Sequence, residues 1–147
     1  MDISAFIATP PYDSKHKIHG SMESHLIKWE EKVGFDSENN TIIENQIDRL
    51  DSILPPLKNF VVPSGNKLLA QIHICRAIAR RCERTFIELY SDGKYLGIYD
   101  IIDNQINSIQ IYLNRLSDYL FMLSRFVGIS LDIEEDLYIK KFKEIKI

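Results

Sequence analysis

The chain has 147 residues, of which 45% are hydrophobic and 27% are charged, and its formal net charge at pH 7 is −3. This length suits one domain with a substantial core and is short for two. The mildly acidic balance argues against a general binder of nucleic acids or membrane surfaces, because such proteins usually carry an excess of basic residues. No apolar run approaches the roughly 18 residues of a membrane-spanning helix.

Residues 1–20 predict an N-terminal arm or tail, because they contain Pro10, Pro11 and Gly20 and show little periodicity. Their ISAFIA segment could form a short strand or pack on the body of the protein. The arm lacks the basic start and apolar block of a secretory signal, and it contains no arginine, so we expect neither a signal peptide nor a mitochondrial presequence. The remaining residues, 21–147, predict one domain.

The first helix of that domain is predicted over residues 21–33. Ser21 and Ser24 can each cap it, apolar residues recur at three- and four-residue steps, and Gly34 follows as a terminator.

A second helix is predicted over residues 41–54. It begins with Thr41 and Glu44, which have the spacing of a capping box, and Pro55 stops it. The connector that follows is expected to be extended, with apolar Phe60 closing the end of the bundle.

The longest helix is predicted over residues 63–90, with Ser64 as its cap or with its free N–H groups receiving an anion. Cys75 and Cys82 lie too far apart on a helix to form a disulfide, so we interpret them as buried apolar side chains in a reducing compartment. The predicted buried stripe consists of Leu69, Ile72, Cys75, Ala79, Cys82, Phe86 and Leu89.

Two further helices are predicted over residues 104–127 and 131–145. Together they complete an all-α, up-down bundle of about five helices without a convincing strand. The core stripe of the first is predicted to be Ile106, Ile109, Leu113, Leu116, Leu120 and Leu123.

A polar seam is predicted between the two longest helices. Arg76, Arg80 and Arg84 recur at four-residue steps, a spacing at which like charges repel, so an anionic partner is expected. One interpretation is a structural ion-pair network in which Asp118 pairs with an arginine across the interface. The other is a polyphosphate site, because planar guanidinium groups bind phosphate oxygens in bidentate fashion.

The sequence does not indicate a phosphate-binding loop, a catalytic nucleophile or a metal site. There is no glycine-rich phosphate loop, and no motif nominates a nucleophile. His16, His19 and His25 are spread over the arm and the start of a helix, so we predict no metal site.

Three segments, FVVPSGN, HICRAIARRCER and YLNRLSDYLFMLSRF, resemble the cob(I)alamin adenosyltransferases of the PduO type. The resemblance covers roughly residues 41–127. It implies a homotrimer with active sites between subunits, and transfer of the 5′-deoxyadenosyl group of ATP to the cobalt of a reduced corrinoid, cob(I)alamin, with release of triphosphate. ATP, with Mg²⁺ as its counter-ion, and cob(I)alamin would be the ligands, with no nucleic-acid or membrane partner. The implied compartment is the cytoplasm or the mitochondrial matrix.

The resemblance also implies roles for individual residues on the ATP side of the site. Arg80 would act in catalysis by contacting the phosphates. Arg76, Glu83 and Arg84 would complete the ATP site, and Asn114 would meet the nucleotide.

Three residues are implied to pair across subunits or to meet the corrinoid. Arg76 would form an intersubunit ion pair, for which Glu23 is a candidate carboxylate, and Asp118 would support the arginine cluster. Phe60 would lie against the corrin, where it would help to displace the lower axial ligand. This role reverses the structural interpretation of Phe60 given above.

The N-terminal region departs from the family pattern. Family members begin with a T-K-x-G-D-x-G-x-T type loop around the ATP phosphates, and nothing in residues 1–20 matches it. The segment between Val33 and Thr41 is also shorter than expected. The alternative hypothesis is therefore a catalytically impaired corrinoid-binding or structural paralogue that lacks the ATP-wrapping loop.

Overall fold

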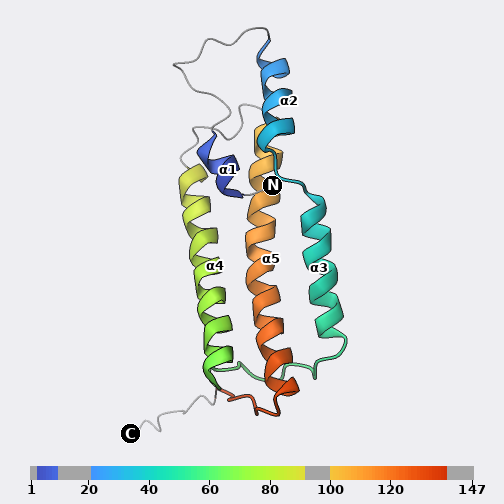
Figure 1. The fold of residues 1–147 in the computed structure, drawn as a ribbon, viewed down its shortest axis with the longest axis vertical. Coiled ribbons are helices and arrows are strands. Elements are labelled where there is room, and N and C mark those ends of the chain that lie inside the picture. Colours follow the sequence, from blue (N-terminus) through green and yellow to red (C-terminus); the bar gives the residue numbers. More distant parts are fainter. Residues whose placement is uncertain (1–2, 10–20, 92–99, 139–147) are drawn as a thin grey trace, which may run out of the picture.

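The computed structural model describes residues 3–9, 21–91 and 100–138, and these ranges contain five helices. α5 lies in the middle of the bundle, with α4 along one side and α3 along the other (Figure 1). The all-α class and the helical bundle are therefore confirmed. The helices are α1 (Ile3–Ala8), α2 (Met22–Val33), α3 (Glu38–Asp51), α4 (Lys67–Ser91) and α5 (Asp100–Ser130).

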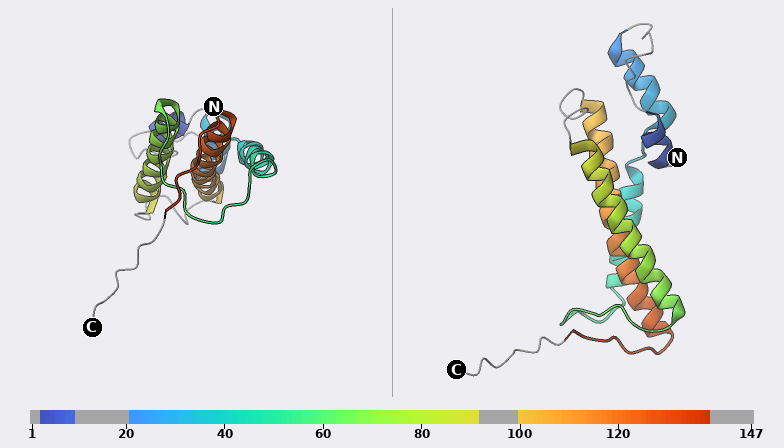
Figure 2. Two further views of the ribbon diagram at one scale, coloured as in Figure 1. Left: turned by 90° about the horizontal axis from the view of Figure 1, so that it is seen from below. Right: turned by 90° about the vertical axis from the view of Figure 1, so that its left-hand side faces the viewer.

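One end of the bundle gathers segments that are distant in sequence. The connector between α3 and α4, the start of α4, the end of α5 and the segment after α5 all lie there (Figures 1 and 2). α1 and α2 lie toward the opposite end. None of the described helices has both the length and the apolar character needed to cross a bilayer.

The start of α2 agrees with the prediction, whereas that of α3 does not. Ser21 caps α2, and its hydroxyl oxygen accepts a hydrogen bond from the backbone N–H of Ser24 at 3.2 Å. α3 begins at Glu38, whose N–H donates to Asp36 Oδ1 at 2.9 Å. The predicted start at Thr41 was wrong, because α3 begins about one turn earlier, where the side chain of Asp36 accepts the N–H of its first residue.

α4 begins four residues later than predicted, at Lys67. Asn66 Oδ1 accepts the backbone N–H of Leu69 at 3.0 Å, so Asn66 is the cap rather than Ser64. Gly65 has a φ of 104°, a conformation that a right-handed helix cannot contain and that glycine tolerates best. The helix therefore cannot extend back to residue 63.

The predicted helix over residues 131–145 was wrong wherever the structure describes it. Asp132 adopts a left-handed φ of 56° directly after α5, and residues 133–138 then run mainly extended. Val61 and Leu137 form an isolated antiparallel bridge. The backbone partner that keeps this segment extended comes from the connector, which local periodicity does not reveal. Residues 139–147 lie outside the described ranges.

The ISAFIA segment packs on the body as α1 rather than forming a strand. Phe6 is 2% exposed, and its ring lies 5.2 Å from that of Trp29 and 6.1 Å from that of Tyr90, measured between centroids. Trp29 Nε1 donates to the carbonyl oxygen of Thr9 at 2.7 Å and so fixes the end of this short helix. Residues 10–20 of the predicted arm lie outside the described ranges.

The buried face of α4 differs from the predicted stripe. Cys75 and Cys82 are both exposed, and Leu89 is 52% exposed, so their predicted burial was wrong. Glu83 and Tyr90 are buried instead. The buried face is rotated toward the polar side of the helix, because α5 offers Glu83 a hydrogen-bond partner.

The stripe of α5 is confirmed in its first half and shifts in its second half. Ile106, Ile109 and Leu113 are buried, but Leu116, Leu120 and Leu123 are only partly covered. Small and polar residues take over the buried positions toward the end of the helix, namely Ser117, Ser124, Arg125 and Gly128.

Candidate functional site

The predicted row of arginines lines an open hollow of about 710 Å³ on the surface of α4. Arg76, Arg80 and Arg84 lie along it on successive turns, and the backbone turn at residues 63–65 borders one end. We call this hollow the arginine groove. Ile74 also lines it and is 59% exposed, so an apolar surface adjoins the three cations.

Arg76 is the partly buried member of the row. Its guanidinium carbon lies 5.2 Å from the centroid of the Phe121 ring on α5, a distance at which a cation and an aromatic face attract each other. Its Nε is buried and has no hydrogen-bond partner within the described part of the chain. The aromatic ring holds the group in place and leaves hydrogen-bonding capacity for another partner.

Glu83 connects α4 to α5 through a chain of polar contacts. Its Oε1 accepts a hydrogen bond from Asn114 Nδ2 at 2.8 Å, and Asn114 Oδ1 accepts one from the guanidinium of Arg115 at 3.0 Å. Glu83 Oε2 lies 4.0 Å from a guanidinium nitrogen of Arg80. The buried carboxylate is thus hydrogen-bonded to Asn114 through one oxygen, while its other oxygen lies near Arg80 without a hydrogen-bond partner among the described residues.

A second open hollow, of about 480 Å³, lies on the other side of this polar chain. Glu44 of α3 lines it together with Glu83, Asn107, Asn114 and Arg115. The structure therefore divides the predicted seam between two hollows, and Glu83 lines only the second of them. The amide groups lie in one hollow and the row of arginines in the other.

Asp118 and Glu23 do not join the arginine groove within this chain. Asp118 lies 3.3 Å from Arg115 on its own helix, not near an arginine of α4. The expected ion pair between Asp118 and the facing helix was therefore wrong within the chain. Glu23 is exposed in the first turn of α2, which lies toward the other end of the bundle from the start of α4. Its pairing with Arg76 between subunits stays a prediction.

Phe60 is 84% exposed on the connector, so the interpretation that it closes the bundle end was wrong. Its backbone is nevertheless held on both sides. The carbonyl oxygen of Phe60 accepts the N–H of Tyr138, and the N–H of Val62 donates to the carbonyl oxygen of Asp136, each at 2.7 Å. A large aromatic side chain is thus presented to solvent from a fixed backbone.

Sequence reasoning missed Arg125, which is 4% exposed near the end of α5. Its guanidinium contacts both Glu135 and the carbonyl oxygen of Pro55. A signal was present, because Arg125 continues the four-residue row that starts with Ile109, Leu113 and Ser117. A basic residue on a buried row requires a partner, and that partner lies beyond the helix.

His73 lies between the arginine groove and a small cavity below the connector. Its Nδ1 is buried and has no hydrogen-bond partner among the described residues. Burial, and then the charge of Arg76, lower the pKa of His73 below its ordinary value of 6.5.

The lowered pKa of His73 predicts a loss of stability in mild acid. Because the unfolded chain has the higher pKa, it takes up the proton first as the pH falls below about 6.5, and the free energy of unfolding decreases until the folded pKa is passed. Urea unfolding at several pH values between about 5 and 7 would measure this decrease. His73→Gln should have a flatter profile, and equal slopes for both proteins would contradict the assignment.

The described residues contain no group of three His, Cys, Asp or Glu side chains placed to hold a metal ion. Of the histidines considered above, His16 and His19 lie outside the described ranges.

Comparison with known proteins adds independent findings. Residues 1–127 match the family model described as cobalamin adenosyltransferase. The chain is 34% identical over 140 residues to the human corrinoid adenosyltransferase MMAB, which covers 95% of this chain and 48% of the relative. It is 36% identical over 91 residues to the corrinoid adenosyltransferase of Bacillus subtilis, which covers 62% of this chain and 42% of the relative.

A solved structure agrees with these sequence matches. It is a variant of the PduO-type ATP:corrinoid adenosyltransferase from Lactobacillus reuteri, complexed with cobalamin and ATP. The TM-score is 0.64 at 25% identity, and the match covers 91% of this chain and 61% of the other. The chain spans about half the length of the curated relatives named here.

Proposed function

Because this chain belongs to the cobalamin adenosyltransferase family, we propose that it transfers the 5′-deoxyadenosyl group of ATP to the cobalt of a reduced corrinoid. The arginine groove is the observation that carries this proposal. Three guanidinium groups on successive turns can together bind several oxygens of one triphosphate. A single structural ion pair would need only one of them.

The reaction also suits a site in which no nucleophilic side chain is indicated. In cob(I)alamin the cobalt is itself the nucleophile, so a bond forms between cobalt and C5′ while the bond between C5′ and the phosphate oxygen breaks. The electron pair of that bond leaves with the triphosphate. The tasks of the protein are then to align the two substrates and to stabilise the charge of the leaving group.

Individual residues take the following parts in the proposed reaction. Arg80 and Arg84 bind the phosphates, and Arg76 adds its charge at the partly buried end of the groove. Glu83 helps to organise the site through its hydrogen bond with Asn114, which faces the adenosine portion from the second hollow. Mg²⁺ is proposed to accompany ATP as the counter-ion of its phosphate oxygens.

We further propose that the active unit is a homotrimer with sites between subunits. Ile74 lines the open arginine groove and is 59% exposed, and Ile78, four residues further along α4, is 44% exposed. Exposed apolar surface beside a cationic groove is typical of an interface. The unpartnered Nε of Arg76 leaves a donor for a carboxylate from the neighbouring subunit, for which Glu23 is the candidate.

A reducing compartment, either the cytoplasm or the mitochondrial matrix, is proposed for this reaction. Cys75 and Cys82 are free and exposed, and such thiols persist best where disulfide formation is disfavoured. ATP and the corrinoid are the proposed partners, and the net charge of −3 does not favour nucleic acid.

The decisive test is to mix the protein with ATP and reductively generated cob(I)alamin, and to follow adenosylcobalamin by absorbance. Product formation by a trimer, as sized by light scattering, is expected. Phe60→Ala should leave ATP binding unchanged and lower the rate about tenfold or more, since it removes an aromatic contact worth about 1.5–3 kcal/mol when buried. Failure of the wild-type protein both to form product and to bind ATP in calorimetry would exclude the enzyme and favour the corrinoid-binding alternative.

A further inference from the structure

We propose that Arg125 and Glu135 are positioning residues, whose ion pair clamps the connector so that Phe60 is held at one place on the surface. The consequence for catalysis rests on the proposed function. The clamp itself rests only on contacts among described residues.

Arg125 ties together three segments that are distant in sequence. From α5, its Nε donates to Glu135 Oε1 at 2.6 Å, and one of its terminal nitrogens donates to the carbonyl oxygen of Pro55 at 2.8 Å. Pro55 lies in the connector, and Glu135 lies in the extended segment after α5. The Arg125 side chain is 3% exposed, so its charge is satisfied by these contacts and not by water.

The segment that carries Glu135 in turn holds the backbone around Phe60. The backbone N–H of Val62 donates to the backbone carbonyl oxygen of Asp136, and that of Tyr138 donates to the carbonyl oxygen of Phe60, each at 2.7 Å. These bonds flank the bridge between Val61 and Leu137. The ion pair between Arg125 and Glu135 therefore anchors the extended segment whose backbone pairs with the residues around Phe60.

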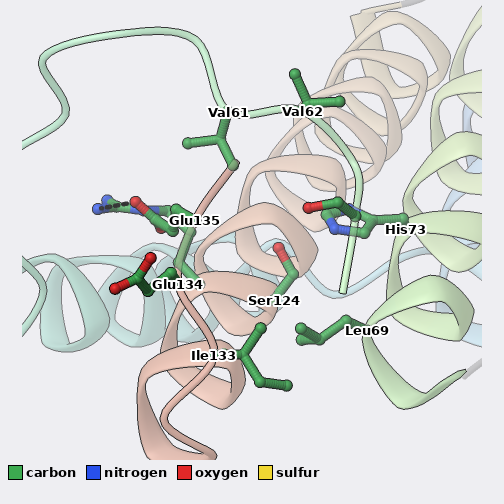
Figure 3. Close-up of a pocket in the computed structure, with 11 residues that line it drawn as sticks. Val61, Val62, Leu69, His73, Ser124, Ile133, Glu134 and Glu135 are labelled. Carbon is green, nitrogen blue, oxygen red and sulfur yellow. Dashed lines mark hydrogen bonds and ion pairs between the residues drawn. The ribbon is translucent and has the colours of Figure 1, made fainter. Parts of the chain in front are cut away.

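A small cavity lies directly under this clamp (Figure 3). Val61 and Ile133 line it from the two bridged segments, and Leu69 and His73 line it from α4. In Figure 3, dashed lines join Glu135 to a guanidinium group, whereas no such line reaches Glu134. The cavity has a volume of only about 30 Å³, so the connector lies close against α4 and α5 here. The ion pair, and not the lining of this cavity, anchors the connector.

The physical reason for such a clamp is the exposure of Phe60. An aromatic side chain that is 84% exposed has few contacts to hold its backbone, so a free connector would sample many positions. The apparent affinity for a ligand of Phe60 would then be reduced to the fraction of time that the connector spends in the binding position. Fixing the backbone before the ligand arrives removes that cost.

The clamp itself can be tested by hydrogen–deuterium exchange on Glu135→Ala, with Glu134→Ala as the matched control. Glu134 is the exposed neighbour, lines the same cavity and forms no ion pair among the described residues. The amides of Val62 and Tyr138 should exchange about tenfold faster or more in Glu135→Ala and should be unchanged in the control. Amides in the middle of α4 should be unaffected in both. Equal exchange at Val62 and Tyr138 in the two variants would overturn the clamp.

The role in positioning Phe60 is tested by kinetics with both substrates. Glu135→Ala should raise the KM for the corrinoid or lower the rate, while the Kd for ATP stays within about twofold of wild type. In a Phe60→Ala background the same substitution should have little further effect, because the positioned side chain is gone. Faster exchange without a corrinoid-specific loss, or full additivity of the two substitutions, would overturn the positioning role.

These outcomes separate the inference from the proposed function. If the wild-type protein formed no adenosylcobalamin and bound no ATP, the proposed function would fail, and with it the catalytic consequence of the clamp. The exchange experiment would still decide whether Arg125 and Glu135 hold the connector, since it needs neither substrate.

Discussion

Arg80→Ala is expected to weaken ATP binding by about 100-fold. Each charge-assisted hydrogen bond to a phosphate contributes about 1.5–3 kcal/mol, so the loss of two such bonds at the lower figure already raises the Kd for ATP by about 100-fold or more. Isothermal titration calorimetry with ATP would measure the change. The stability of the fold should hardly alter, because the Arg80 side chain is 46% exposed and its distance to Glu83 is 4.0 Å.

Arg81→Ala provides the matched control for that experiment. Arg81 is the adjacent residue, has the same charge and is exposed, but it does not line the arginine groove. Its replacement should change ATP affinity only slightly, through the general loss of one positive charge. Equal losses for Arg80→Ala and Arg81→Ala would contradict a specific phosphate site. A loss of stability without a loss of affinity for Arg80→Ala would favour the structural ion-pair interpretation.

Phe6→Ala is expected to lower the free energy of unfolding by about 3–5 kcal/mol, which is the usual cost of removing a buried aromatic ring. Phe6 is 2% exposed and packs on Trp29 and Tyr90, so the substitution would leave a cavity among three helices. Urea unfolding monitored by circular dichroism would measure the change. A large effect would establish that α1 belongs to the folded body.

Ile7→Ala on the same short helix serves as the comparison. Ile7 is 42% exposed, so its replacement should cost no more than about 0.5 kcal/mol. Similar small effects for both variants would mean that α1 contributes little to the fold in solution.

Local sequence patterns predicted the helices well where the apolar periodicity within the segment is enough to specify a helix. The periodicity of α4 and α5 placed both correctly over most of their lengths, and Ser21 was one of the two predicted caps of α2. The starts of α3 and α4 were misplaced because single side-chain hydrogen bonds, from backbone N–H groups to Asp36 and to Asn66, set them. Several residues near each start could cap equally well, so composition does not select among them.

The candidate site was predicted in part. The four-residue spacing of Arg76, Arg80 and Arg84 was sufficient to place them along one groove, because the geometry of a single helix fixes it. The burial of Glu83 was not predictable in the same way. A charged residue on a helix is normally assigned to solvent, and only the hydrogen bond from Asn114 on another helix makes burial acceptable.

The sequence by itself determined the helical class, the row of arginines and the resemblance to the adenosyltransferases, because each depends on residues close together along the chain. The tertiary structure alone decided which polar groups are buried and which apolar groups are exposed. Cys75 and Phe60 lie on the surface, while Arg125 lies inside between Pro55 and Glu135. The free energy of burying a charge depends on partners that folding brings from distant segments, and no local pattern contains them.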